Sequence, residues 1–357
     1  MIPTTKEEIT TEWLNLGLQS LLNQHNRIIG FKIQDGSAGR GFTGQILKVL
    51  LQYENPDSVL PESVIFKTQL QLNLPLEATK QMFKANLNEV RWYTEWSDGC
   101  PIAIPKCHHA DVNEESHTTC MLLEDLSGML AGPPEKGLDK HQSRLALKNI
   151  ARLHAKYWER EFDHIEIREN LKSASFLRNI DQGWADLVTH FPHLFDKNFA
   201  ARKETFVSCA HDYPTKLLKR RTLIHGDFKL DNILFHPSDP DKMVLLDWQG
   251  ISLGSAALEV AGFLPRSLTV TDYAKWHKEL LETYHFELCQ HGDFDYPFSE
   301  FLQDYKMGLI VSFIGNIGFT PTLLSSELSG DDPVRDDRMR TYFELIFKRK
   351  FKAMELH

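Results

Sequence analysis

A short stretch of the chain carries polar residues whose types and spacing suit acid–base and metal chemistry. His225, Asp227 and Asn232 lie in a polar segment, and Asp247 follows a little further on. The two carboxylates and the amide oxygen could serve as one general base and two ligands of a hard cation. Mg²⁺ prefers such a set, because it takes a few protein oxygens together with the phosphate oxygens of a substrate.

Apolar runs flank these residues and must position them. Leu223-Ile224 leads into the polar segment, 233–235 leads out of it, and 243–246 ends just before Asp247. The turn-forming residues 236–241 separate the last two runs, so the pattern predicts three short strands. Polar side chains at strand ends would then face a shared cleft. The alternative is a plain β-hairpin whose polar loop residues cap the backbone.

A glycine pattern lies upstream in a region of strand-like sequence. Gly39, Gly41 and Gly44 form G-x-G-x-x-G, and a backbone without Cβ can approach phosphate oxygens and offer them N–H groups. In dinucleotide-binding proteins a helix follows this pattern. Here residues 46–53 have the pattern of another strand. The sequence therefore favours a glycine loop within a hairpin, although isolated matches also occur in flexible hairpins.

Lys67 ends the apolar run 63–66, and a lysine placed there can contact the α- and β-phosphates of a nucleotide. Such a lysine needs a carboxylate to hold it. Glu89 is the candidate, since it lies in the helix-patterned segment 84–93. The alternative is that Lys67 and Glu89 are unrelated surface charges, but the glycine pattern upstream favours the functional pair.

Together these motifs resemble those of the protein-kinase-like phosphotransferases. The segments 225–227 (His-Gly-Asp) and 247–249 (Asp-Trp-Gln) are similar to motifs of the aminoglycoside phosphotransferase and choline kinase superfamily, nearest its ecdysteroid-kinase-like and bacterial branch. The resemblance implies a catalytic Asp227, with His225 supporting its loop and with Asn232 and Asp247 as Mg²⁺ ligands. It also implies an ATP site that includes Gly39, Gly41, Gly44, Lys67 and Glu89.

Two further segments fit this resemblance. Residues 122–126 (Leu-Leu-Glu-Asp-Leu) are similar to the superfamily's hinge, in which main-chain groups of Glu124 and Leu126 would pair with adenine. Glu259 stands where the superfamily usually has an aspartate that braces the catalytic loop, and its extra methylene could alter that support. His154 lies in a Leu-His-Ala element and is interpreted as a packing residue.

The expected fold class is α+β, a two-lobed protein-kinase-like fold. Residues 1–123 would form an N-terminal lobe with a small antiparallel sheet and a helix C, and 124–127 the hinge. Residues 128–357 would form a larger, mostly helical lobe that carries the catalytic loop and the acceptor pocket. Aromatic residues within 162–220 are expected to be core, and the basic cluster Lys348–Lys352 is expected to be a solvated helix face.

Composition limits the classes of partner. The chain has 357 residues, 42% hydrophobic and 25% charged, with a net charge of −9, which is ordinary for a globular protein and does not indicate nucleic-acid or anionic-membrane binding. Five scattered cysteines without C-x-x-C spacing favour reduced thiols and a cytoplasmic location. We see no signal peptide or membrane span, and the sequence is silent on oligomeric state.

The resulting functional hypothesis is a kinase that moves the γ-phosphoryl group of ATP to a hydroxyl of a small molecule, with ATP and Mg²⁺ required. One alternative is a nucleotide-binding pseudokinase or regulatory protein without turnover. A protein kinase is less favoured, because no Ala-Pro-Glu element follows Asp247 and an apolar helix pattern begins soon after it. The identity of the acceptor is not encoded in these motifs.

Overall fold

The computed structural model describes residues 2–22, 26–35, 44–56, 59–69, 76–165, 174–195, 197–327 and 333–357. The chain divides into two compact units. The first unit comprises residues 1–130, 236–238 and 244–251, and the second comprises 131–235, 239–243 and 252–357. The division at 130/131 lies just beyond the predicted hinge, and the segment that carries Asp247 is grouped with the first unit.

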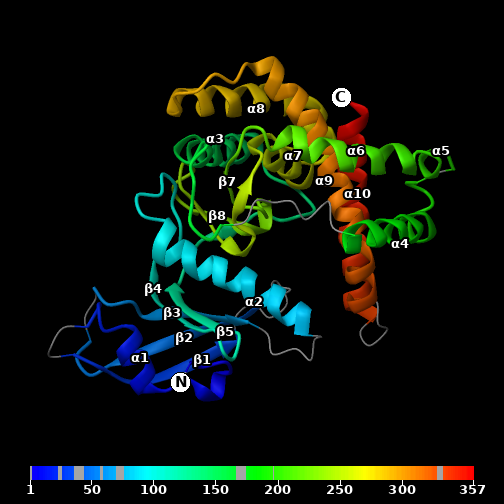
Figure 1. Ribbon diagram of the computed structural model, residues 1–357. Coiled ribbons are helices and arrows are strands. Elements are labelled where there is room, and N and C mark those ends of the chain that lie inside the picture. Colours follow the sequence, from blue (N-terminus) through cyan, green and yellow to red (C-terminus); the bar gives the residue numbers. More distant parts are fainter. Residues whose placement is uncertain are drawn as a thin grey trace. The chain divides into compact units, whose positions relative to one another are not determined.

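A five-stranded antiparallel sheet organises the first unit, with the strand order β1-β2-β3-β5-β4 (Figure 1). Its strands are β1 (Ile28–Asp35), β2 (Gly44–Tyr53), β3 (Ser63–Gln69), β4 (Cys107–Asn113) and β5 (Thr118–Glu124). The other elements of this unit are the 3₁₀ turn Lys6–Glu8, α1 (Thr11–Gly17), α2 (Leu76–Arg91), the π-helical turn Trp92–Trp96 and the 3₁₀ turn Trp248–Gly250. The sheet agrees with the predicted antiparallel β-rich half.

The two faces of this sheet are covered by different helices. Side chains alternate along a strand, so Val64 and Phe66 of β3 share one face and pack with Trp13 of α1. Ile65 belongs to the opposite face, where Val90 from α2 packs against β5. Lys67 has the same parity as Ile65, and alternation therefore directs its ammonium group toward α2.

Helices dominate the second unit, as predicted for the larger half of the chain. They are α3 (Lys140–Lys156), α4 (Ala174–His190), α5 (Lys197–Ala200), α6 (Lys203–Leu217), α7 (Ala256–Ser267), α8 (Val270–His291), α9 (Phe298–Glu327) and α10 (Pro333–Glu355). Among the described helices, none is both long and apolar enough to cross a membrane. The α+β prediction is confirmed.

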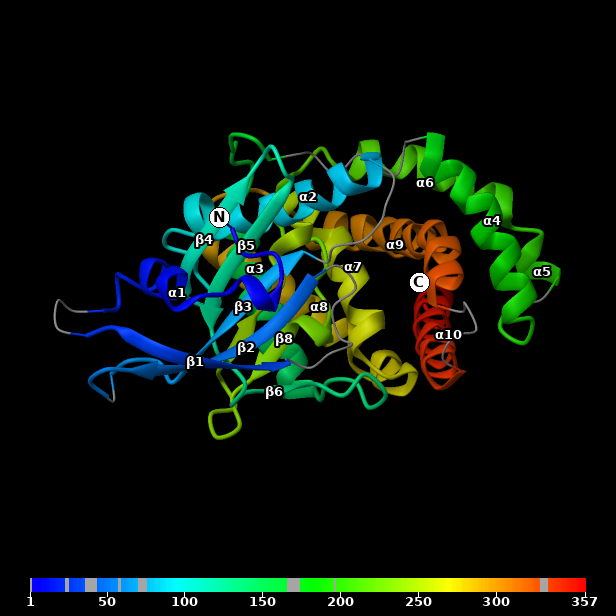
Figure 2. The ribbon, with the colours of Figure 1, turned by 90° about the horizontal axis from the view of Figure 1, so that it is seen from below.

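An aromatic core joins α4, α5, α6, α9 and α10, which lie together in both ribbon views (Figures 1 and 2). Trp184 stacks on Phe199 with ring centroids 4.7 Å apart, and Phe313 of α9 packs against both Phe195 and Phe347. These side chains are buried. The core expected for the aromatic residues of the 162–220 segment is thus formed by Trp184, Phe191, Phe195, Phe199 and Phe206, whereas Phe162 and Tyr213 are half-buried and lie outside it.

Short strands hold the loop that carries Asp227. They are β7 (Thr222–Ile224), which pairs antiparallel with β10 (Ser252–Gly254), and β8 (Ile233–Phe235), which follows the 3₁₀ turn Leu230–Asn232. Two further short strands are β6 (Leu130–Ala131) and β9 (Met243–Leu245). All three residues of β7 are buried, so the loop begins at a well-anchored point.

The basic cluster near the C-terminus differs from expectation. Arg349 and Lys350 are only 4% and 2% exposed, so this part of α10 is not a solvated face. The Lys350 ammonium group donates to the carbonyl and hydroxyl oxygens of Ser312, at 3.0 and 2.7 Å. Burial lowers the pKa of Lys350 well below its ordinary value. Lys348 and Lys352 are exposed, as predicted, so the prediction is wrong only for Arg349 and Lys350. A run of basic residues does not reveal which of them face a neighbouring helix.

Candidate active site

Lys67 is held between two carboxylates in the first unit. Its Nζ atom lies 2.7 Å from Glu89 Oε2 and 2.8 Å from Asp247 Oδ1. The Lys67 and Glu89 side chains are 9% and 1% exposed, whereas that of Asp247 is 38% exposed. Three positions far apart in the sequence thus form one ion cluster, and its open side is at Asp247.

Charge balance keeps this lysine protonated. Burial alone would lower the pKa of Lys67, but attraction from Glu89 and Asp247 outweighs it, and the pKa is raised. The lysine therefore presents a permanent positive charge, as contact with a polyphosphate requires.

The backbone around Asp247 is held in an uncommon conformation. Asp247 has φ 64° and ψ 71°, in the left-handed region, which costs a non-glycine residue on the order of 1 kcal/mol. Trp248 offsets this cost, because its indole stacks on Trp92 at 4.0 Å and its backbone N–H donates to Glu89 Oε1 at 3.3 Å. Helix α2 thus supplies the carboxylate that binds Lys67 and also supports the turn after Asp247.

In the second unit Asp227 is surrounded by donors. Its Oδ2 atom lies 2.6 Å from Lys229 Nζ and 3.2 Å from Asn232 Nδ2, and its Oδ1 atom lies 3.3 Å from Arg266 Nη1. Burial alone would raise the pKa of Asp227, but Lys229 and Arg266 lower it to about 2. The carboxylate is therefore ionised at neutral pH, and at 35% exposure it is open to a ligand.

Glu259 on α7 supports the backbone of the same loop. Its Oε2 atom accepts the His225 N–H at 2.9 Å, and its Oε1 atom accepts the Gly226 N–H at 2.6 Å. His154, which is fully buried, bonds to Glu259 Oε2 at 3.0 Å and to the Tyr284 hydroxyl at 2.7 Å. The longer glutamate thus reaches the loop backbone, as the usual aspartate was expected to do.

The loop itself turns sharply at its glycine. Gly226 has φ 83°, a conformation that a residue with a Cβ rarely adopts. The next residue, Asp227, donates its N–H to His225 Nδ1 at 3.3 Å, a bond within the loop.

Sequence reasoning did not single out Arg266. It also assigned no role to Lys229, which the structure pairs with Asp227. The sequence offered no local signal for Arg266, because a helix usually ends near a proline and Pro265 precedes it. In the structure α7 continues past Pro265 to Ser267, and Glu259 and Arg266 lie seven residues apart on it. That spacing places both on the same helix face.

The structure describes only part of the backbone that was predicted to bind the nucleotide, namely the glycine loop and the hinge. Gly39 and Gly41 lie outside the described residues, and Gly44 is the first residue of β2. In the predicted hinge, the Glu124 N–H donates to Lys106 O at 2.8 Å, and the Leu126 carbonyl accepts the Met129 N–H at 2.9 Å. The Glu124 N–H is thus already paired, whereas the Leu126 carbonyl oxygen has a second lone pair.

The donors Asn232 and Asp247 suit Mg²⁺ chemically. Asn232 Nδ2 donates to the Asp227 carbonyl at 2.9 Å and to its carboxylate. Both bonds use the amide nitrogen of Asn232, so its amide oxygen takes no part in them. Within the described residues, no three His, Cys, Asp or Glu side chains form a metal-binding group. Mg²⁺ commonly takes few protein oxygens together with phosphate oxygens.

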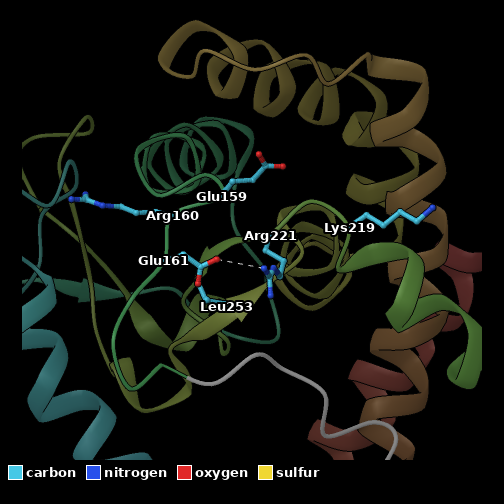
Figure 3. Close-up of a pocket in the computed structure, with 6 residues that line it drawn as sticks. All are labelled: Glu159, Arg160, Glu161, Lys219, Arg221 and Leu253. Carbon is cyan, nitrogen blue, oxygen red and sulfur yellow. Dashed lines mark ion pairs between the residues drawn. The ribbon is translucent and has the colours of Figure 1, made fainter.

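A separate polar cavity of about 190 Å³ lies in the second unit, lined by Glu159, Arg160, Glu161, Lys219, Arg221 and Leu253 (Figure 3). Glu161 and Arg221 face each other at 3.7 Å, while Arg160 and Lys219 extend away from that pair. Arg221 precedes β7, at the strand end opposite His225. The cavity is therefore distinct from the Asp227 loop.

The chain has the protein-kinase-like fold, which it shares with solved choline kinase and aminoglycoside phosphotransferase structures. Residues 38–293 match the model of the ecdysteroid kinase-like family, so the chain belongs to that family. The resemblance inferred from the motifs is confirmed.

Solved structures show the same fold at low sequence identity. Choline kinase LicA from Streptococcus pneumoniae is 11% identical with a TM-score of 0.51, over 97% of this chain and 99% of that one. Amicoumacin kinase hAmiN, in complex with AMP-PNP, Ca²⁺ and Ami, is 12% identical with a TM-score of 0.52, over 95% and 94% of the two chains. At these identities the likeness establishes the fold alone.

Curated relatives match only in part. Acyl-CoA dehydrogenase family member 11 of Gallus gallus is 26% identical over 186 residues, which is 49% of this chain and 22% of that protein. Acyl-CoA dehydrogenase family member 10 of Mus musculus is 46% identical over 43 residues, 12% of this chain and 4% of that protein. The chain thus spans less than a quarter of the length of these relatives.

Proposed function

We propose that this protein is an ATP- and Mg²⁺-dependent phosphotransferase that moves the γ-phosphoryl group of ATP to a hydroxyl group of a small molecule. The observation that carries the proposal is the ion cluster of Lys67, Glu89 and Asp247. A buried lysine held by a buried helix carboxylate and by a half-exposed aspartate suits the binding of nucleotide phosphates. Membership of a kinase-like family supports the same conclusion.

In the proposed reaction each group has a distinct task. Lys67 binds the α- and β-phosphates, and Glu89 keeps it in place. Asp227 orients the acceptor hydroxyl for in-line attack on the γ-phosphorus and accepts its proton. Asn232 and Asp247 would hold Mg²⁺, which when bound neutralises charge on the phosphate oxygens. Most of the acceleration then comes from positioning and electrostatic stabilisation.

The depressed pKa of Asp227 bears on its task. A carboxylate whose pKa is about 2 is a weak base, so it holds a proton poorly before the reaction. It can still orient the hydroxyl as a hydrogen-bond acceptor throughout, and it takes the proton late, when the attacking oxygen has become acidic. Orientation is therefore the larger part of its contribution.

The division of labour along the chain is part of the same proposal. We propose residues 1–123 as the nucleotide-binding part, 124–127 as the hinge and 128–357 as the part that carries the acceptor pocket. The reaction requires Lys67 and Asp227 to act on one bound triphosphate. A small-molecule acceptor rather than a peptide remains our proposal, as does a cytoplasmic location.

Substitution of Asp227 by Asn tests the proposal most directly. Loss of the carboxylate should reduce phosphorylation by roughly 10³-fold, while the thermal shift caused by ATP and Mg²⁺ persists. The acceptor is found first, by screening hydroxylated metabolites for ADP release. Asp241→Asn is the control, because the Asp241 side chain is 79% exposed and pairs only with His141 among the ion pairs described. Full turnover by Asp227→Asn would contradict the assignment.

The same measurements separate the alternative without turnover. A nucleotide-binding pseudokinase would show the thermal shift with ATP and Mg²⁺ but no ADP release with any acceptor. A protein kinase would label peptide substrates in preference to metabolites. Turnover is favoured because positions 67, 89, 227, 232 and 247 all carry residues that can perform the proposed chemistry.

A further inference from the structure

One face of α7 contacts the Asp227 loop at successive turns. Glu259, Phe263 and Arg266 occupy positions i, i+4 and i+7 of this helix, and residues with this spacing share a face. Glu259 accepts loop N–H groups at one end of that face. Phe263 stacks on Phe228 in the middle, with ring centroids 4.2 Å apart. Arg266 meets the Asp227 carboxylate at the other end.

The two oxygens of Asp227 have different partners. Oδ1 faces Arg266 at 3.3 Å, and Oδ2 faces Lys229 at 2.6 Å and Asn232 at 3.2 Å. Lys229 belongs to the loop itself, and its long flexible side chain can exchange one partner for another. Arg266 comes from a helix, so the carboxylate is tied to a second element of the unit.

Arg266 is itself well anchored. Its carbonyl accepts a bond from Arg349 Nη1 at 3.2 Å, and Arg349 also donates to Glu135 O at 3.1 Å. Burial alone would lower the pKa of Arg266, but attraction to Asp227 outweighs it, and the pKa is raised. With 20% of its side chain exposed, Arg266 is a restrained cation rather than a mobile surface group.

We propose that Arg266 is the positioning residue for Asp227: it holds Oδ1 through the reaction, so that Oδ2 receives the acceptor hydroxyl when Lys229 moves away. Glu259 supports the loop backbone, and Arg266 sets the orientation of the reactive side chain on that backbone. The inference rests on the proposed phosphotransfer. It adds a residue that the sequence motifs do not contain, on a helix that was expected only to brace the loop.

Three variants test this role. Arg266→Gln removes the cation, Arg266→Lys retains it, and Arg152→Gln is the control, because it breaks an ion pair of 2.6 Å with Glu287 elsewhere in the unit. The kcat, the KM for MgATP and the melting temperature are measured for each with the acceptor found by the screen, or with water as acceptor. Release of ADP is the readout.

We expect Arg266→Gln to lower kcat by about 10²-fold, since a misplaced reactive group costs that much, with the KM for MgATP changed by less than about twofold. Arg266→Lys should recover most of the loss, and Arg152→Gln should keep the wild-type kcat. A rate that Arg266→Gln leaves unchanged overturns the inference. So do equally slow Gln and Lys variants whose melting temperatures both fall, because they indicate a purely structural role.

The wild-type protein distinguishes this inference from the function on which it rests. Absence of ADP release by the wild-type protein, with every acceptor and with water, contradicts the proposed phosphotransfer and with it the role of Arg266. An active wild-type protein with an unaffected Arg266→Gln variant contradicts the role of Arg266 alone.

Discussion

The two units present charge clusters of opposite design. In the first unit one cation, Lys67, lies between the carboxylates of Glu89 and Asp247. In the second unit one carboxylate, that of Asp227, lies between the cations Lys229 and Arg266. Each cluster keeps its central group charged, since the pKa of Lys67 is raised and that of Asp227 is lowered.

The difference between the clusters lies in how deeply each central group is buried. The Lys67 side chain is 9% exposed, and that of Asp227 is 35% exposed. A buried cation without its anionic partners strongly destabilises the folded state. A partly exposed carboxylate needs its partners mainly for orientation. Variants of the first cluster should therefore affect stability and activity together, and variants of the second should affect activity more.

Lys67→Met should have the largest effect. Removal of the cation leaves the Glu89 carboxylate buried, with 1% of its side chain exposed, and stability should fall by about 3–5 kcal/mol. Chemical denaturation of the purified variant measures the loss, and ADP release should also be abolished. As a control, Arg27→Met breaks an exposed ion pair with Glu54 in the same unit and should cost far less.

A double variant separates the two consequences of that change. Lys67→Met combined with Glu89→Gln removes the buried charge as well as its partner and keeps an acceptor for the Trp248 N–H, so most of the lost stability should return. Activity should stay absent, because no cation remains to bind the phosphates. Recovery of activity in the double variant would show that Lys67 serves the fold rather than the nucleotide.

The first cluster could be predicted from the sequence because each of its members lies in a recognisable local pattern. Lys67 ends an apolar strand, Glu89 lies in an amphipathic segment, and Asp247 follows an apolar run. Strand alternation and helix periodicity are local properties, so they can be read residue by residue. The antiparallel sheet and the helical C-terminal half followed from the same periodicities.

The second cluster could be predicted only in part. Asp227 lies in a recognisable motif, but the contact of Arg266 with Asp227 depends on tertiary packing, as does the burial of Lys350. Arg266 reaches Asp227 because α7 lies against the loop, and Lys350 is buried because α10 packs on α9. Nothing local distinguishes these residues from solvated basic side chains. The orientation of a helix about its axis, which decides both cases, is set by contacts that lie far apart in the sequence.

Glu259→Gln should have the next largest effect. The amide replaces one carboxylate oxygen with an NH₂ group, so one of the His225 and Gly226 N–H donors loses its acceptor. An unsatisfied buried donor costs about 1–3 kcal/mol, and kcat should fall because the loop that carries Asp227 is less well supported. Thermal denaturation and ADP release measure the two effects.

The control for Glu259→Gln is Glu279→Gln, on α8 of the same unit. Glu279 pairs with Lys140 at 2.6 Å, but both side chains are more than 40% exposed. This substitution should leave melting temperature and kcat at their wild-type values. Equal behaviour of the two variants would show that the bonds from Glu259 to the loop contribute no more than a surface ion pair.

Gly226→Ala should have the smallest effect. Its loss of stability is compared with that of Gly128→Ala, which adds a Cβ to a glycine of the first unit. Gly226 has φ 83°, so an added Cβ should cost about 1 kcal/mol of stability and should slow turnover by displacing Asp227. A Cβ at Gly128, in the first unit, meets no atom within 4 Å and should be tolerated. Denaturation midpoints of the two variants make the comparison. Equal midpoints would contradict the inference that the left-handed turn at Gly226 shapes the loop.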